Sequence, residues 1–240
     1  MLLQGRNAVT EALRSDVTVE KVLVLKDAPN INSKPVVNMC RDKKIPVQFV
    51  DRYALDRLCK GGDHRGFVAV TTEYKYYPIE ELTAKKEGKD RLLIICDGIE
   101  DPHNLGAIVR VVDCAGADGI VIPGRRCCGV TDTVVKVSSG AANHVKIAKV
   151  TNVNDVIRDL KEDGYTVFAA DMDGDSIYKT NLKGDVAIVV GGEGNGIHAL
   201  TKKLCDGVIS LPQNGKVNSL NASVAAGIAL YECVRQRSDL

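Results

Sequence analysis

A run of apolar, mostly β-branched residues that ends in a cluster of glycines is the feature of this sequence that most constrains its fold. The run covers residues 186–190, and Gly-Gly-Glu-Gly-Asn-Gly follows at once over residues 191–196. A short β-branched segment is typical of a buried parallel strand, and glycines directly after it let a ligand approach the backbone closely. We therefore predict a parallel strand at 186–190 and a cofactor-binding loop at 191–196.

The order of residues in this loop indicates which cofactor suits it. The glycines do not follow the G-x-G-x-x-G spacing of dinucleotide-binding loops. Glu193 places a negative charge where a pyrophosphate would need backbone N–H groups. A dinucleotide therefore fits poorly, and a cofactor with a cationic or neutral edge fits better.

Strand-like and helical stretches alternate through the larger, second part of the chain. Besides the run at 186–190, segments typical of strands occur at 92–96, 119–122, 145–148, 166–170 and 208–211. This alternation favours an α/β domain over residues 91–240, with a mostly parallel sheet covered by helices on both faces. Ligands of such sheets bind outside the carboxyl ends of the strands, which is where the unusual residues of this chain lie.

The first 75 residues predict a separate, smaller domain. Its expected elements are helices at 7–13, 36–43 and 51–59 and strands at 22–25, 47–50 and 67–70. Together they would form a compact α/β/α sandwich over residues 1–75. Residues 76–90 are polar, contain Pro78 and a run of charges, and indicate a linker with at most one helical turn.

The net charge of +1 is unevenly distributed between these two parts. Residues 1–75 contain 13 lysines and arginines against 9 acidic residues, a net charge of +4, whereas the remainder contains 19 against 22. A basic small domain beside a slightly acidic larger one suits a module that captures a polyanion. An ordinarily solvated surface explains a charge of +4 equally well.

Composition excludes several other classes of protein. No apolar run approaches the length of a bilayer span, and the first residues lack the pattern of a signal peptide, so we expect a cytoplasmic protein without membrane contact. The eight cysteines are scattered and the four histidines show no ligand spacing. No metal site or disulfide framework is therefore expected.

Another informative segment follows the first strand of the larger domain. Apolar residues at positions 105, 108, 109 and 112 repeat at helical spacing, which predicts a buried helix face and places Asn104 in the first turn. Taken alone, Asn104 is best explained as a helix N-cap. Arg110 lies off the apolar stripe and, taken alone, is a solvated helix residue.

Three segments together resemble, in order and spacing, the motifs of the SpoU (TrmH) family of RNA ribose 2′-O-methyltransferases. They are Asp-Pro-x-Asn-Leu-Gly-x-x-x-Arg at 101–110, Gly-Gly-Glu-Gly-Asn-Gly at 191–196, and Leu-Pro at 211–212 followed by Ser-Leu-Asn-Ala-Ser at 219–223. Residues 5–13 and 64–69 are similar to the ends of the L30e-like RNA-binding domain in the RlmB-type branch of this family. That branch methylates a guanosine of large-subunit ribosomal RNA.

The resemblance implies a fold, a reaction and a set of site residues. The fold would be a SPOUT domain with a C-terminal trefoil knot, preceded by the L30e-like RNA-binding domain. The reaction would transfer a methyl group from S-adenosyl-L-methionine (AdoMet) to a ribose 2′-hydroxyl of RNA, in a homodimer that binds neither DNA nor membrane. The catalytic positions would be Asn104, Arg110, Glu193, Ser219 and Asn221, and the cofactor contacts would be Gly191, Leu211 and Leu220.

Three alternatives stay open at this point. The chain could instead methylate transfer RNA, or belong to the antibiotic-resistance branch that methylates ribosomal RNA, because these branches share the three motifs. It could also be a non-catalytic RNA-binding platform of the same fold, although such a binder has no need for the complete catalytic set. A nucleotide-dependent dehydrogenase is disfavoured by the glycine spacing.

The chemistry of the implied catalytic side chains suggests their roles. Because a guanidinium stays protonated in proteins, we expect Arg110 to hold an RNA phosphate with two hydrogen bonds rather than to remove a proton. It would also stabilise charge that develops on the ribose oxygen. Asn104, Ser219 and Asn221 would orient the ribose, and Glu193 would orient either Arg110 or the asparagines.

Overall fold

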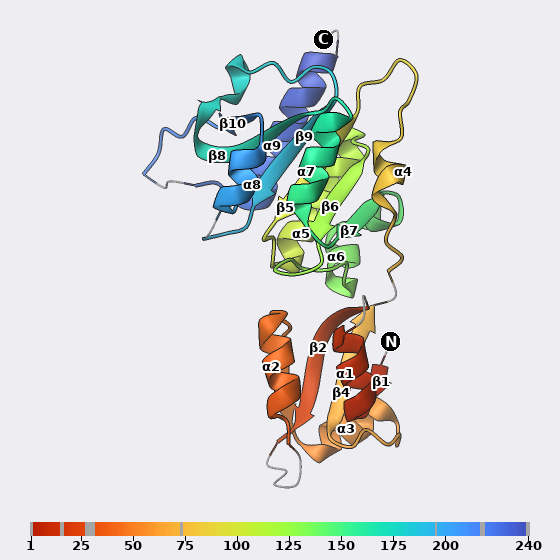
Figure 1. The fold of residues 1–240 in the computed structure, drawn as a ribbon. Coiled ribbons are helices and arrows are strands. Elements are labelled where there is room, and N and C mark those ends of the chain that lie inside the picture. Colours follow the sequence, from red (N-terminus) through yellow and green to blue (C-terminus); the bar gives the residue numbers. More distant parts are fainter. Residues whose placement is uncertain are drawn as a thin grey trace. The chain divides into compact units, whose positions relative to one another are not determined.

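The computed structural model describes residues 2–14, 17–26, 32–72, 74–194, 196–216 and 219–238. The chain folds into two compact units, each with its own sheet (Figure 1). The first unit consists of Met1–Lys75 and Gly129–Asp132, and the second of Tyr76–Cys128 and Thr133–Leu240.

The first unit is a mixed sheet with helices on both faces. Its elements in chain order are β1 (Leu2–Gln4), α1 (Arg6–Arg14), β2 (Thr18–Leu25), α2 (Lys34–Asp42), β3 (Val47–Val50), α3 (Arg52–Cys59) and β4 (Phe67–Thr72). The strand order is β1-β4-β2-β3, with β2 parallel to β3 and antiparallel to β4. Strand β1 pairs with β4. The sequence did not predict β1, because three residues are too few to show a periodicity.

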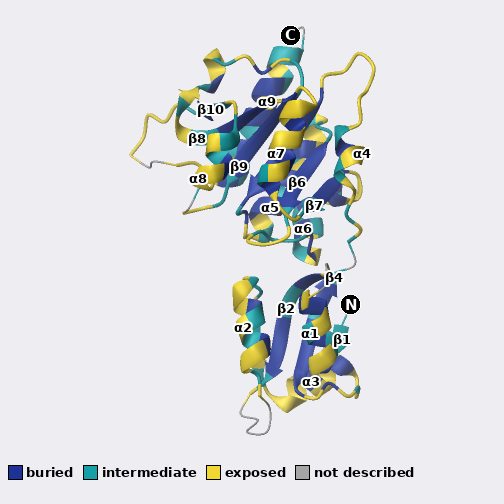
Figure 2. Ribbon diagram, viewed as in Figure 1, coloured by how far each residue is buried: buried dark blue, intermediate teal, exposed yellow. Residues whose placement is uncertain are grey.

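Alternating side chains along β2 supply two cores, one on each face of this sheet. Val24 packs in a cluster with Val9 and Leu13 of α1. Leu23, its neighbour in the chain, packs instead with Leu55 of α3. Successive side chains of a strand point to opposite faces, so one strand contributes to both cores. Figure 2 shows the long strands of this unit buried and the outer sides of its helices exposed.

The second unit is built on a parallel sheet with the strand order β10-β8-β9-β5-β6-β7. Its strands are β5 (Leu92–Asp97), β6 (Gly119–Pro123), β7 (Ile147–Val150), β8 (Thr166–Ser176), β9 (Val186–Gly191) and β10 (Gly207–Ser210). Its helices are α4 (Ile79–Thr83), α5 (Pro102–Ala115), α6 (Asp132–Val137), α7 (Val153–Glu162), α8 (Ala199–Leu204) and α9 (Ala222–Arg237), with short 3-10 turns at Ala141–Asn143 and Ile177–Lys179. The predicted α/β fold with a parallel sheet is confirmed, and the trefoil knot stays a prediction.

The neighbouring strands β5 and β9 end level with one another. Their register pairs Asp97, the last residue of β5, with Gly191, the last residue of β9. Both strands are buried along nearly their whole length, because α7 packs on one face of the sheet and α5 and α9 pack on the other. The loops that follow β5 and β9 therefore start side by side at one edge of the sheet.

Residues 76–90, expected from the sequence to be a linker with at most one helical turn, lie within the second unit. The backbone N–H of Tyr77 donates to the carbonyl of Ile147 in β7 (2.9 Å). The expected helical turn is present as α4 and places Leu82 in the core, where it is 1% exposed. Ile79 and Leu82 are three positions apart and therefore lie on one side of this turn, which explains its packing against the sheet.

The buried side chain of Arg91 links three segments of the second unit. Its guanidinium donates to Asp185 (2.7 and 3.0 Å), to Asp163 and to the carbonyl of Thr83 (2.6 Å), and lies over the ring of Tyr165. Hydrogen bonds from Arg91 lower the pKa of Asp163. Burial alone would raise the pKa of Asp185, but hydrogen bonds from Arg91 outweigh burial and hold this pKa below its usual value.

Replacing Arg91 by Met should destabilise the second unit by about 1–3 kcal/mol at pH 7, because the partly buried carboxylate of Asp185 loses its cationic donor. A carboxylate whose pKa is lowered by folding stabilises the folded state above its unfolded pKa of about 4. That contribution is lost as the pH falls through the folded pKa. The stability difference between wild type and variant should therefore shrink below about pH 4.

Urea unfolding at pH 7 and pH 3, followed by circular dichroism, measures this difference. Arg158→Met is the matched control, because Arg158 is half-exposed and paired only with the exposed Asp155 among the contacts of the described residues. Arg158→Met should lower the free energy of unfolding by less than about 1 kcal/mol at either pH. If Arg91→Met lowers the free energy of unfolding equally at both pH values, the ion pairs of Arg91 are not the source of the stabilisation.

Within the described ranges, no helix is long and apolar enough to cross a membrane, and His, Cys, Asp and Glu side chains form no cluster able to hold a metal ion. The cysteines are free thiols. Burial raises the pKa of the Cys40 and Cys233 thiols to about 11. Both are therefore uncharged packing residues at neutral pH.

Candidate active site

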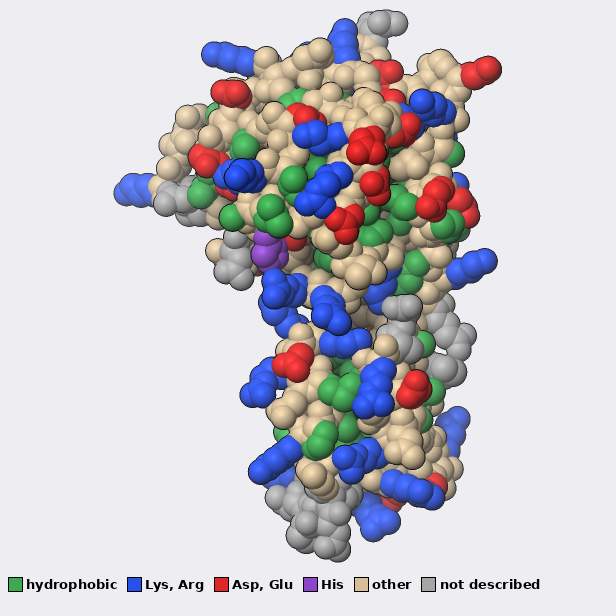
Figure 3. Space-filling view, in the orientation of Figure 1, with side chains coloured by type: hydrophobic (Ala, Val, Ile, Leu, Met, Phe, Trp, Pro, Cys, Tyr) green, Lys and Arg blue, Asp and Glu red, His purple; other side chains and the backbone are tan. Residues whose placement is uncertain are grey.

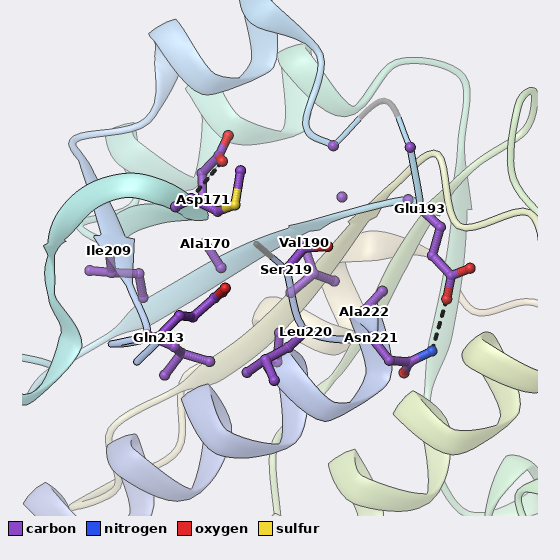
Figure 4. Close-up of a pocket in the computed structure, with 17 residues that line it drawn as sticks. Ala170, Asp171, Val190, Glu193, Ile209, Gln213, Ser219, Leu220, Asn221 and Ala222 are labelled. Atoms are coloured by element: carbon purple, nitrogen blue, oxygen red, sulfur yellow. Dashed lines mark hydrogen bonds between the residues drawn. The ribbon is translucent and has the colours of Figure 1, made fainter. Parts of the chain in front are cut away.

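A pocket of about 550 Å³ opens where β9 ends, beside the middle of β8 (Figure 4). Its walls come from these two strands, the glycine loop after β9, the end of β10 with the segment after it, and the start of α9. The apolar lining includes Val190, Ile209 and Ala222, and the polar side chains are Asp171, Glu193, Gln213, Ser219 and Asn221. The pocket thus lies at the carboxyl ends of parallel strands, where α/β sheets bind their ligands.

The residues expected to contact a cofactor all line this pocket: Gly191, Leu211 and Leu220. The lining also includes Asp171 and Met172, for which the sequence offered no signal. They lie where β8 continues past residue 170, its expected end, through a polar stretch without the alternation typical of a strand. Lys202 of α8 donates to the carboxylate of Asp171 (2.8 Å) and holds it at the wall of the pocket.

Close packing of backbone explains two glycines of the loop after β9. A Cβ atom on Gly191 would clash with the carbonyl carbon of Gly196, and one on Gly192 would clash with the carbonyl oxygen of Gly98. The close approach predicted at this loop is present, but the group that approaches Gly192 is the backbone of the loop after β5. Asn195 lies outside the described residues.

Glu193 joins Asn104 and Asn221 in a hydrogen-bonded network at the edge of the pocket. Figure 4 shows the bond between Glu193 and Asn221. Oε1 of Glu193 accepts from Nδ2 of Asn221 (2.8 Å) and from Nδ2 of Asn104 (2.9 Å). Nδ2 of Asn221 also donates to Oδ1 of Asn104 (2.8 Å). We call these three side chains the amide–carboxylate network. Of the two roles expected for Glu193, the structure shows contact with the asparagines.

Asn104 does not cap α5. The N-cap is Asp101, whose carboxylate accepts from the backbone N–H of His103 (2.9 Å), and Pro102 is the first residue of the helix. The interpretation of Asn104 as an N-cap is therefore wrong. Asn104 lies inside the first turn, is 7% exposed and uses its amide for the network instead.

Asn221 does cap a helix, and this fixes the direction of its amide. Its Oδ1 accepts from the backbone N–H groups of Ser223 (3.0 Å) and Val224 (3.3 Å) at the start of α9. It also accepts from the hydroxyl of Ser223 (2.6 Å). Because Oδ1 is occupied by donors of the helix, the amide NH₂ is left to point toward Glu193 and Asn104. The start of α9 therefore positions a donor of the network.

The remaining two expected catalytic residues lie in different places. Ser219 lines the pocket close to the network, whereas Arg110 does not line it. Arg110 is exposed on α5 and donates to the hydroxyl of Ser139 (3.2 Å). It lies six positions after Asn104, which is a rotation of about 240° around a helix. Among the described residues, the site thus brings Asn104, Glu193, Ser219 and Asn221 together and leaves Arg110 apart.

Two family models match this chain. The SpoU rRNA methylase family matches residues 91–231, and RNA 2′-O ribose methyltransferase substrate binding matches residues 2–77. The chain is 40% identical to a Bacillus subtilis (strain 168) protein named as TrmH family tRNA/rRNA methyltransferase, over 98% of this chain and 95% of that protein. A relative from Staphylococcus saprophyticus with the same description is 37% identical over 99% of this chain and 96% of its own. The chain belongs to the SpoU/TrmH family.

Solved structures of SpoU/TrmH proteins share the fold. The SpoU methyltransferase AviRb from Streptomyces viridochromogenes, in complex with AdoMet, matches with a TM-score of 0.63 at 24% identity, over 99% of this chain and 90% of its own. An AdoMet-bound rRNA methyltransferase from Sinorhizobium meliloti matches with a TM-score of 0.64 at 23% sequence identity. The match covers 99% of this chain and 88% of that protein. The predicted family and its activity, 2′-O-methylation of RNA, are confirmed.

The pocket fits AdoMet in size and in chemistry. Its volume lies within the usual range of small-molecule sites, and its lining combines apolar side chains with a few polar groups. Two carboxylates line it, Asp171 and Glu193, which suits a cofactor with a positively charged sulfur. Gly191, Leu211 and Leu220 would hold the cofactor by backbone and apolar contacts.

Changing Asn221 to Asp should lower methyl transfer about 100-fold or more, because catalysis of this kind depends on exact positioning. An aspartate still caps α9 through one oxygen. Its other oxygen replaces the NH₂ group beside Glu193, so a donor is lost and two negative charges meet. Single-turnover methylation rates measure the loss, and thermal unfolding should show a nearly unchanged midpoint.

Two further variants separate the network from simple charge. Combining Asn221→Asp with Glu193→Gln exchanges donor and acceptor and should recover about tenfold of the lost rate. Gln213→Glu adds a negative charge to the pocket wall outside the network and should remain within several-fold of wild type. Equal losses in Asn221→Asp and Gln213→Glu would mean that pocket charge, not the network, controls the rate.

Proposed function

We propose that this methyltransferase modifies the ribose of a guanosine in large-subunit ribosomal RNA. The first unit carries the proposal, because the substrate-binding family model matches residues 2–77. Within it, residues 5–13 and 64–69 resemble the L30e-like domain of the RlmB-type branch. A TrmH/SpoU tRNA modifying enzyme from A. aeolicus matches over only 66% of this chain, at 27% identity and a TM-score of 0.57. Transfer RNA is the alternative substrate.

In the proposed reaction the protein acts mainly by positioning. AdoMet supplies a methyl group that is already activated by its bond to a positively charged sulfur. The amide–carboxylate network and Ser219 orient the ribose hydroxyl toward the cofactor pocket. Both asparagines donate to Oε1 of Glu193, so Oε2 can accept a hydrogen bond from that hydroxyl. Such positioning supplies about 7–11 kcal/mol of a barrier.

Arg110 acts on the RNA side of the reaction in this proposal. It lies outside the cofactor pocket, and its exposed guanidinium has a weakly held partner in Ser139 (3.2 Å). A guanidinium binds a phosphate through two parallel hydrogen bonds and stabilises negative charge nearby. The proton of the 2′-hydroxyl then leaves through the phosphate or water, because arginine does not deprotonate.

We also propose that the enzyme is a homodimer that pairs through α9 and its start. Leu220, Val224 and Tyr231 are apolar or aromatic residues with 41%, 48% and 51% of their surface exposed. Exposed apolar groups gathered on one element are typical of a subunit interface.

Comparing RNA from cells with and without this gene tests the substrate. Large-subunit ribosomal RNA from the deletion strain should lack one 2′-O-methylated guanosine, and the gene supplied on a plasmid should restore it. The gene carrying Asn221→Asp should not restore it. Loss of a methyl group from transfer RNA alone, with ribosomal RNA unchanged, would contradict the proposal.

Arg110→Ala should lower methyl transfer about 100-fold or more, yet leave AdoMet affinity within twofold, because Arg110 does not line the pocket. Arg110→Lys should be almost as inactive, since lysine keeps the charge but loses the two-pronged hydrogen bonding. Single-turnover rates between neutral and alkaline pH distinguish holding from proton removal. A Lys variant that recovers toward the wild-type rate at high pH would contradict the phosphate-holding role.

A further inference from the structure

Phe49 is an aromatic side chain without a place in either core of the first unit. It lies on the edge strand β3 and is 55% exposed, whereas Phe67 and Phe168 are 2% and 9% exposed. A phenylalanine contributes most to folding when it is buried, so an exposed one does little for the stability of this small domain. Its ring is instead available to a ligand.

The ring of Phe49 lies in a shallow hollow of about 800 Å³ at the end of β2 and β3. Two cationic residues, Lys26 and Arg52, line the same hollow, and both are exposed. The lining acid, Asp51, uses its carboxylate to accept from the backbone N–H of Ala54 (2.7 Å) as the cap of α3. Phe49 therefore shares the lining of one concave surface with two cationic side chains.

We propose that this hollow binds an unpaired nucleotide of the RNA substrate, with the base stacked on Phe49 and the adjoining phosphates held by Lys26 and Arg52. Every base has a flat aromatic face, so stacking suits single-stranded RNA of any sequence. A paired base has its faces covered by its neighbours in the helix and cannot use the ring.

The charge of the surrounding surface favours a nucleic acid over an apolar peptide. Residues 1–75 carry a net charge of +4, and Lys and Arg predominate over Asp and Glu on the face of this unit seen in Figure 3. A ring flanked by cations is the combination that proteins use to bind single strands. An apolar peptide or a second copy of this basic unit would place uncompensated positive charge in the contact.

The inference rests on the proposed function, since it assigns a site to the RNA substrate. The probe is a fluorescein-labelled oligouridine of about 12 nucleotides, within the usual span of a single-strand site, compared with an RNA duplex of equal length. Binding to the full chain is followed by fluorescence anisotropy. Phe49→Leu should weaken oligouridine binding about tenfold and leave duplex binding within twofold, whereas Phe49→Tyr should bind like wild type.

Two controls define the site. Tyr53→Leu removes an aromatic ring that is 75% exposed four residues away but does not line the hollow, and it should bind within twofold of wild type. Irradiation of a 5-iodouridine version of the probe should couple the RNA to the peptide that contains Phe49. Unchanged oligouridine affinity in Phe49→Leu, or coupling only to other peptides, would overturn the inference.

The experiment distinguishes failure of the stacking site from failure of the proposed function. Binding of oligouridine requires no methyl transfer, so the result stands whether ribosomal or transfer RNA is the substrate. If wild type methylates ribosomal RNA and Phe49→Leu binds oligouridine normally, only the stacking site is wrong. If Phe49→Leu instead lowers the mass of the protein in sedimentation, the hollow binds a second copy of the chain and the inference is overturned.

Discussion

A single carboxylate oxygen that accepts two amide donors is the interaction on which the candidate site depends. Oε1 of Glu193 accepts from Asn104 and Asn221, which lie 89 and 28 positions away in the sequence. Each partner belongs to a different segment, the first turn of α5 and the start of α9. Charge-assisted hydrogen bonds of this kind are stronger than neutral ones, and the amides would lose their acceptor without the carboxylate. The network therefore ties the glycine loop after β9 to the first turn of α5 and to the start of α9.

The parallel sheet explains how residues so far apart in the chain meet. Strands β5 and β9 end level, so the loop that leads to Asn104 and the loop that carries Glu193 start next to each other. Gly192 packs against the backbone of Gly98, which leaves no space for a Cβ atom between these loops. Asn221 is fixed independently, because its oxygen caps α9. Backbone packing and helix capping thus direct the polar atoms before any substrate binds.

Much of the fold and part of the site could be predicted from the sequence, for physical reasons that differ between elements. Buried parallel strands such as β5 and β9 are short apolar runs, and their strong pattern located both. The motif likeness located Asn104, Glu193, Ser219 and Asn221. Asp171 was missed because β8 continues through a polar stretch in which burial does not alternate. The packing of α4 was missed because one helical turn shows no full period. The exposure of Arg110 was predicted, because this residue lies off the apolar stripe of α5.

A crystal structure of this protein with AdoMet tests the central claim most directly. The cofactor should lie in the pocket against Gly191, Leu211 and Leu220, with its sulfonium methyl group directed toward the amide–carboxylate network. The hydrogen bonds of Glu193 to Asn104 and Asn221 should be kept. AdoMet bound elsewhere, or bound in the pocket with its methyl group directed away from an opened network, would contradict the account.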